Sequence, residues 1–195
     1  MLKGSSLAGT SNTRERVEND YYATPISSTE ALLNKIEFKG DFLEPCVGGG
    51  HIAKVIKEYY PNNCVCCMDI VYRGYKDTIV SDFLKHDFKG KKFDSIITNP
   101  PYSMAQEFVE KSMSILNGKG KVAMFLKIQF VEGLKRLDFF KDYPPKYIYV
   151  FSKRQNPWRN GSPLDEKGKQ WSSTMCFAWF IWEEGFCGEP IVRWI

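Results

Sequence analysis

The stretch FLEPCVGGGHI, residues 42–52, decides the fold. It joins a short apolar strand to three glycines and to the first residues of a helix. Gly48, Gly49 and Gly50 allow the backbone to turn sharply and to approach a ligand closely. Dinucleotide sites have a similar order of strand, glycine-rich turn and helix. Glycines after a strand also form simple turns, so this run alone is a weak indication of a ligand site.

Two acidic residues narrow the kind of ligand. Asp69 ends the following predicted strand, about twenty residues after the glycines, where an acid can bind ribose hydroxyls. Glu44 precedes the glycines, where a carboxylate would repel a pyrophosphate. A ligand with a positive charge and no phosphate therefore fits this turn better than a dinucleotide.

Strand and helix patterns alternate along the rest of the chain, which favours an α/β fold. Helices are predicted at 27–36 (with Ser27 and Glu30 spaced as a capping box), 51–60, 104–116 and 130–143. Strands are predicted at 41–45, 64–70, 77–83, 93–98, 121–128, 146–153 and 172–182. Only a loop separates the last two strands, so they should pair antiparallel at one edge. The expected fold is a Rossmann-like seven-stranded mixed sheet with helices on both faces.

Length and composition predict one globular domain. The chain has 195 residues, of which 43% are hydrophobic and 26% are charged, as in ordinary soluble proteins. No apolar run reaches the length of a membrane span, and the start of the chain has no signal-peptide pattern. We expect a flexible segment at 1–19 and a single domain at 20–195.

The six cysteines do not form a metal-binding pattern. Cys64, Cys66 and Cys67 lack the paired CxxC arrangement, and the chain has only two histidines. We interpret them as buried structural thiols and expect no metal. Reduced thiols point to the cytoplasm.

The stretch DSIITNPPY, residues 94–102, is the second informative motif. An apolar strand ends on an asparagine, two prolines and an aromatic residue. The prolines fix two φ angles and restrict the residues before them. This rigid elbow presents the Asn99 amide and the Tyr102 ring, which suits a planar ligand bearing an amino group. The alternative is that the prolines only terminate the strand.

The motifs together resemble the class I S-adenosylmethionine-dependent methyltransferases. FLEPCVGGGHI, MDI (68–70), VSDFL (80–84) and NPPY (99–102) occur in the order seen in that family. More narrowly, the chain resembles DNA adenine-N6 methyltransferases whose cofactor motifs precede the catalytic one. DYYATP (20–25) is similar to their N-terminal cofactor motif. The segments 126–136, 150–154 and 177–185 are similar to small phage and prophage enzymes, which implies a bacterial or phage-infected cell.

The resemblance implies S-adenosylmethionine as the cofactor and a role for each matching residue. Asp69 would take the ribose hydroxyls, Asp82 the adenine amino group, and Phe83 would pack on the adenine ring. The chain departs from the family pattern at Cys46, where Ser or Ala is common, and at the additional Gly49. The implied cofactor-binding residues are Tyr22, Thr24, Pro25, Glu44, Pro45, Gly48, Gly50, Asp69, Ile70, Asp82 and Phe83.

The resemblance also implies that Asn99, Pro100, Pro101 and Tyr102 are catalytic. An exocyclic aromatic amine is a poor nucleophile because its lone pair is delocalised into the ring. If the Asn99 oxygen and the Pro100 carbonyl accept its two N–H bonds, electron density moves onto nitrogen with little reorganisation. Tyr102 would stack on a base pulled out of its helix.

A basic region follows these motifs. Residues 127–169 contain ten basic and five acidic residues, a surplus that exceeds the net charge of +4 of the whole chain. About eighteen of them, residues 154–171, show no apolar period, and loops of such length are commonly functional. Trp158 and Trp171 flank basic residues there, as in nucleic-acid contacts. The predicted nucleic-acid-binding residues are Lys153, Arg154, Trp158, Arg159 and Lys169.

The sequence therefore predicts methyl transfer to the N6 amine of adenine in DNA. We expect no separate target-recognition domain, so loops or an accessory recognition protein would supply specificity, or the specificity would be weak. A monomer and a homodimer both stay open, and no membrane partner is expected. Two alternatives stay open as well. One is methylation of the guanine-N2 amine in RNA or the glutamine-N5 amide in proteins, and the other is a non-catalytic, cofactor- and DNA-binding phage protein.

Overall fold

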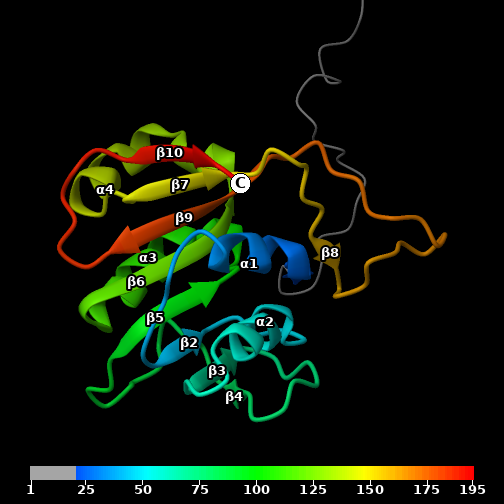
Figure 1. Ribbon diagram of the computed structural model, residues 1–195, viewed down its shortest axis with the longest axis horizontal. Coiled ribbons are helices and arrows are strands. Elements are labelled where there is room, and N and C mark those ends of the chain that lie inside the picture. The colour runs from blue at the N-terminus through cyan, green and yellow to red at the C-terminus, as the bar shows by residue number, and fades with distance from the viewer. Residues whose placement is uncertain (1–20) are drawn as a thin grey trace, which may run out of the picture.

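The computed structural model describes residues 21–195, so the expected flexible segment 1–19 lies outside the described residues. A central sheet has the strand order β10-β7-β9-β6-β5-β2-β3-β4 (Figure 1). Its strands are β2 (Phe42–Glu44), β3 (Val65–Asp69), β4 (Ile79–Val80), β5 (Phe93–Thr98), β6 (Leu116–Lys127), β7 (Tyr147–Val150), β9 (Phe177–Glu183) and β10 (Ile191–Trp194). The α-helices are α1 (Ile26–Leu33), α2 (His51–Tyr59), α3 (Ala105–Ser114) and α4 (Leu137–Asp142).

The predicted Rossmann-like α/β fold is confirmed, with one strand more than expected. Strands β2 to β6 pair in parallel, and β9 lies antiparallel between β6 and β7. The expected pairing of the strands at 146–153 and 172–182 is therefore present. They do not form the sheet edge, because β10 adds an eighth strand parallel to β7. Its four residues are all exposed, so they lack the alternation that identifies a strand in a sequence.

The sheet is buried on both faces, as its apolar strands require. Successive residues point to opposite faces, so Ile96 packs in one apolar core and Ile97 in the other. Helices α3 and α4 cover the face of Ile96, to which they contribute Phe108 and Phe139. Helices α1 and α2 cover the face of Ile97 (Figure 1). Because helices cover both faces of the sheet, a ligand can approach the strands only at their ends.

Two predicted helices differ in detail. Helix α1 begins after Pro25, with no side-chain cap, so the predicted capping box of Ser27 and Glu30 is wrong. Proline fixes a φ suited to a helix start, which places Ser27 inside the first turn. The helix expected at 130–143 is broken at Gly133, where φ is 123°. It is replaced by the 3₁₀ turns η3 (Ile128–Val131) and η4 (Leu134–Arg136), followed by α4.

A long loop leaves the main sheet between β7 and β9. Its residues 154–171, here called the excursion, contain β8 (Trp158–Arg159). Strand β8 pairs antiparallel with β1 (Tyr22–Ala23), near the beginning of the described chain. Figure 1 shows the rest of the excursion reaching away from the sheet. The resulting β1–β8 ribbon joins two segments that are far apart in the sequence.

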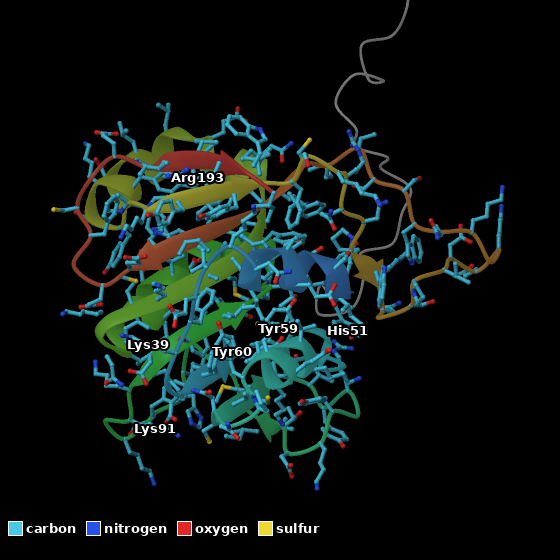
Figure 2. The ribbon with its side chains drawn as sticks, in the orientation of Figure 1. Lys39, His51, Tyr59, Tyr60, Lys91 and Arg193 are labelled. Atoms are coloured by element: carbon cyan, nitrogen blue, oxygen red, sulfur yellow. The ribbon has the colours of Figure 1, made fainter. Side chains whose placement is uncertain are left out.

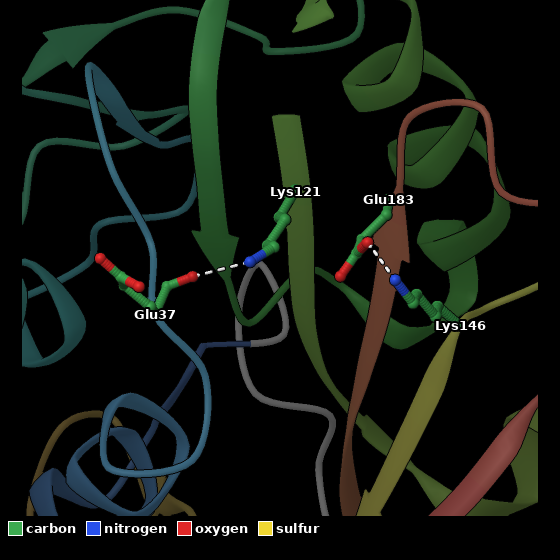
Figure 3. A network of polar contacts seen from close by, with 4 residues as sticks. All are labelled: Glu37, Lys121, Lys146 and Glu183. Carbon is green, nitrogen blue, oxygen red and sulfur yellow. Dashed lines mark hydrogen bonds and ion pairs between the residues drawn. The ribbon is translucent and has the colours of Figure 1, made fainter. Parts of the chain in front are cut away.

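Polar contacts fix the half of the sheet that lies away from the ribbon. The Lys146 ammonium lies 2.6 Å from a Glu183 oxygen and joins β7 to β9. The Lys121 ammonium donates to the main-chain carbonyl of Glu37 at 2.8 Å (Figure 3). Such partly exposed contacts contribute little free energy individually, about 1 kcal/mol or less.

The described residues contain neither a cluster of metal-ligating side chains nor a helix that could cross a membrane. Among the described residues, no group of three or more metal-ligating side chains comes together. All six cysteines are free thiols, and Cys67 is buried, whereas Cys64 is exposed, contrary to our expectation of a buried thiol. No described helix has the length and apolar character to cross a membrane.

Candidate active site

The carboxyl ends of β2, β3 and β5 form a cleft, as expected for an open α/β sheet. Cys46 and Val47, which lead into the glycine-rich turn after β2, line one side of it, whereas the predicted Gly48 and Gly50 are not part of its wall. Ten of the predicted site residues line the cleft. They are Tyr22, Thr24, Glu44, Pro45, Asp69, Ile70, Asp82, Phe83, Asn99 and Pro101.

The glycine-rich turn adopts the conformations that only glycine favours. Gly48 has φ 51° and Gly50, which caps α2, has φ 81°. The Gly48 N–H donates to Asp69 at 2.8 Å, so the turn is tied to the end of β3. A Cβ at Gly48 would lie 2.4 Å from the Tyr21 ring. The glycines thus allow an aromatic ring to lie directly on the turn.

Tyr21 is a central residue that sequence reasoning missed, although it belongs to the DYYATP motif. Its hydroxyl accepts the Gly49 N–H at 3.0 Å, and the Arg73 guanidinium lies 4.3 Å from its ring centre. Burial raises the pKa of the Tyr21 phenol. Tyr21 and Arg73 both line the cleft. No sequence motif identifies Arg73 as a site residue, because it lies in the loop after β3.

Glu44 is the most unusual charged group in the cleft. It is 1% exposed, and its Oε2 has no hydrogen-bond partner among the described residues. Burial raises the pKa of its carboxyl well above the usual range, and the Asp69 charge raises it further. A hydrogen bond from the Ala53 backbone opposes this shift. An uncompensated buried carboxylate in a cleft is suited to receive a cation or a hydrogen-bond donor.

The other two acids are held by backbone N–H groups. Asp69 accepts from Gly48 and from Val71, at 2.8 and 3.0 Å. Asp82 accepts from the Leu84 N–H at 3.0 Å and lies 3.4 Å from the Lys85 ammonium. Both carboxylates line the cleft in fixed orientations. Each has oxygen lone pairs left for the hydroxyl or amino group of a ligand.

Asn99 lies at the end of β5 with its amide in a defined orientation. Its Nδ2 donates to the Tyr22 main-chain carbonyl at 2.7 Å. A carbonyl oxygen can only accept, so the facing atom must be the amide nitrogen and not the oxygen. Asn99 therefore offers its Oδ1, an acceptor, to a molecule in the cleft. Pro101 lines the cleft beside it, while Pro100 is buried.

The Tyr102 ring does not line the cleft, where stacking on a base would require it. Tyr102 begins the 3₁₀ turn η2 (Tyr102–Met104) and is not part of the cleft wall. Its ring centre lies 6.1 Å from that of Phe177 and 4.8 Å from the Lys127 ammonium. The ring is half-buried between the two apolar cores. Its stacking on a base stays a prediction.

Several lining residues were not singled out by the sequence as part of the site. His51 is the first residue of α2 and also lines the cleft. Burial and the Lys54 charge lower the pKa of its imidazole. Its ring meets the Trp158 ring edge-on, with centres 5.5 Å apart. Figure 2 shows His51 at the end of α2 that faces the excursion. The other lining residues of this kind include Cys46, Val47, Met104 and Phe108.

Three of the five predicted nucleic-acid-binding residues line a second, wider hollow. Lys153, Arg154 and Trp158 line this groove together with Trp171, between α1 and the excursion. Pro25, which was predicted for the cofactor, lies here rather than in the cleft. The Arg154 guanidinium donates to the Ser173 carbonyl at 2.8 Å, so it also holds the excursion. Arg159 stands opposite Tyr22 in the β1–β8 ribbon, and Lys169 is exposed outside the groove.

Comparison with solved structures identifies the fold. A Listeria monocytogenes protein assigned to the class I S-adenosylmethionine-dependent methyltransferases superimposes with a TM-score of 0.62 at 13% identity, covering 88% of this chain. The M protein of the type I restriction enzyme EcoKI gives 0.61 at 13% identity over 85% of this chain. An S-adenosylmethionine-dependent O-methyltransferase from Thermotoga maritima gives 0.55 at 17% identity over 84% of this chain.

These likenesses establish a class I methyltransferase fold and no more. This chain spans 64% of the Listeria protein, 44% of the EcoKI M protein and 66% of the Thermotoga protein. No protein-family model and no curated protein sequence matches the chain.

Proposed function

We propose that this protein transfers a methyl group from S-adenosylmethionine to the N6 amine of adenine in DNA. The observation that carries the proposal is the Asn99 amide, whose nitrogen is bound to Tyr22 so that its oxygen is left as an acceptor in the cleft. Class I methyltransferase neighbours support the activity, and the EcoKI M protein among them favours a DNA substrate.

The residues of the cleft fit this cofactor. S-adenosylmethionine supplies a methyl group activated on a positively charged sulfonium. The buried Glu44 carboxylate, with one oxygen unpartnered among the described residues, suits the positive amino acid end of such a molecule. Asp69 would hold the ribose hydroxyls and Asp82 the adenine amino group. Ile70 is 57% exposed at the cleft wall, and Phe83 is buried beside it, so both offer apolar surface for the adenine ring.

The reacting amine would be held by acceptors of this chain. The Asn99 Oδ1 and the Pro100 carbonyl each accept one of its N–H bonds, which concentrates electron density on the nitrogen. Both acceptors stand on a rigid elbow after β5, so little reorganisation is needed during the reaction. An acceptor pair selects an amino group and disfavours a carbonyl oxygen, which would face it with like partial charge.

The basic groove would receive the DNA backbone and its bases. Lys153 supplies positive charge, and Trp158 and Trp171 supply aromatic surface on its walls. Basic side chains with interleaved aromatic rings are the common means of contacting unstacked nucleotides. We propose Lys153, Arg154, Trp158, Arg159 and Lys169 as the DNA-contacting residues.

Nucleoside mass spectrometry tests the proposal. DNA, RNA and protein fractions are incubated with the purified chain and an isotope-labelled methyl donor. We expect labelled N6-methyladenine in DNA, and a loss of about a hundredfold to a thousandfold in Asn99→Ala, the range that removing one preorganised polar partner costs. The control is Asn34→Ala, at an exposed asparagine outside the cleft. Label in guanine of RNA or glutamine of protein, with none in DNA, would contradict the assigned substrate.

A further inference from the structure

The orientation of Asn99 depends on a main-chain carbonyl that the excursion holds in place. Tyr22 accepts the Asn99 amide at 2.7 Å, although the two residues are 77 positions apart. Among residues 21–195, β8 is the strand that pairs with β1 and so holds Tyr22 in a two-stranded sheet. The hydrogen bond that orients the Asn99 amide therefore comes from the ribbon.

The pairing geometry explains why the Tyr22 carbonyl faces Asn99. The Asn160 N–H donates to the Tyr21 carbonyl at 3.2 Å, so Tyr21 and Asn160 are a hydrogen-bonded pair. In an antiparallel ladder the next pair, Tyr22 with Arg159, is not hydrogen-bonded. Its main-chain groups therefore point away from the partner strand. This alternation turns the Tyr22 carbonyl outward, toward the Asn99 amide.

Further contacts attach the ribbon to the cofactor side of the cleft. The Tyr21 hydroxyl accepts from Gly49 at 3.0 Å, and Trp158 packs edge-on against His51. A Cβ at Gly161 would lie 2.9 Å from the Tyr21 hydroxyl, so the excursion closes directly over this ring. Both strands of the ribbon thus touch the glycine-rich turn or the helix after it.

We infer that the β1–β8 ribbon is the positioning element of the active site, because it sets the Tyr22 carbonyl that orients the Asn99 amide. The inference rests on the proposed function, in which the Asn99 oxygen accepts the substrate amine. It gives the excursion a second role besides contact with DNA. Without the ribbon the amide can rotate and present its NH₂ group to the amine, which is the wrong polarity for it.

A pair of substitutions at Asn160 tests the inference. Asn160 is exposed, has φ 51°, and its N–H makes the ribbon hydrogen bond. Asn160→Pro removes this donor and imposes a negative φ, whereas Asn160→Gly keeps the donor and suits the positive φ. With DNA and cofactor at saturation, we expect kcat to fall at least about tenfold in Asn160→Pro, the size of a lost hydrogen bond of about 1.4 kcal/mol. Asn160→Gly should retain kcat.

The division between kcat and KM separates positioning from binding. If the excursion only contacts DNA, Asn160→Pro raises KM for DNA and leaves kcat unchanged, and the inference is overturned. A fall in kcat of equal size in Asn160→Gly would also contradict it, since that variant keeps the hydrogen bond.

A measurement without turnover distinguishes failure of the inference from failure of the proposed function. The side-chain amide signal of Asn99 is identified in ¹⁵N-resolved NMR spectra by its absence in Asn99→Ala. We expect it to shift and to exchange faster with solvent in Asn160→Pro and to stay in place in Asn160→Gly. An unchanged signal in Asn160→Pro overturns the inference even if the wild type methylates DNA. A shifted signal supports it even if the wild type methylates no DNA.

Discussion

At the scale of single residues, Glu44 shows how the cleft is prepared for a positively charged ligand. A buried carboxyl without a full set of partners stays protonated or costs free energy to ionise. The raised pKa of Glu44 follows from its burial and from the Asp69 charge beside it. A cation in the cleft would restore the ionised form. Sequence reasoning placed Glu44 near the turn but had no means of finding its unpartnered oxygen.

The raised pKa of Glu44 predicts how stability depends on pH. In the unfolded chain a glutamate has a pKa of about 4.3, so between that value and the higher folded pKa the folded protein binds more protons. Its stability therefore falls as pH rises through this window. We expect Glu44→Gln to reduce this fall and to raise the free energy of unfolding at pH 8 by about 1–3 kcal/mol. Urea unfolding at pH 5 and pH 8 measures both effects.

The control for Glu44 is Glu37→Gln, at an exposed carboxylate. We expect it to change the free energy of unfolding by no more than about 0.5 kcal/mol. A loss of stability in Glu44→Gln at pH 8 would show that the carboxylate is compensated in the folded protein.

The two prolines of NPPY illustrate what a motif can and cannot predict. The end of the strand at Thr98 and the rigid elbow after it follow from proline chemistry alone. The partner of the Asn99 amide does not, because Tyr22 comes from a segment 77 residues away. The Tyr102 ring likewise packs near Phe177, which no local pattern indicates. Such contacts depend on the topology of the sheet.

At the scale of elements, the predicted bounds are close for some elements only, since β9 begins at Phe177 and not at 172, and β6 begins at Leu116 and not at 121. The strand at 93–98 was predicted with the bounds that the structure has, and the helices at 51–60 and 104–116 differ by two residues or fewer at each end. The ribbon strands β1 and β8 were missed because each has two residues and only the pairing defines them. The break at Gly133 was missed because the flanking residues favour a helix.

Strand β9 joins the sheet to α1 through one buried side chain. Trp179 is fully buried, and its indole N–H donates to the Ser28 carbonyl at 2.8 Å. Trp179→Phe removes this donor and part of the packing. We expect a loss of about 2 kcal/mol in the free energy of unfolding, measured by chemical denaturation. Trp194→Phe is the matched control because Trp194 is 70% exposed, and a similar loss there would show that the contact with α1 is not the cause.

At the scale of the whole molecule, the excursion carries four basic and two acidic residues. Lys153 lines the groove and Lys169 stands exposed at its margin. Figure 2 shows Lys39 and Lys91 at the opposite end of the molecule. If DNA binds along the excursion, neutralisation of its phosphates by Lys153 and Lys169 releases counterions. Lys39 and Lys91 would then contact no phosphate and release none.

This distribution predicts the salt dependence of DNA binding. We expect Lys153→Ala combined with Lys169→Ala to reduce the slope of log K against log salt by about 2, roughly 0.9 for each phosphate contact. Fluorescence anisotropy between low and moderate salt measures the slope. Lys39→Ala combined with Lys91→Ala, which removes the same charge, should leave it unchanged. Equal slopes in the two double variants would show that the excursion is not the DNA-binding side.

The place of β9 in the sheet has a consequence for synthesis of the chain on the ribosome. Strands β6 and β7 are made first, yet β9 lies between them and pairs with both. Until residue 183 has emerged, the nascent sheet has an open slot with two unpaired strand edges beside it. The sheet can therefore be completed only after β9 has been translated. We expect the nascent chain to be most prone to aggregation, and most dependent on chaperones, before that point.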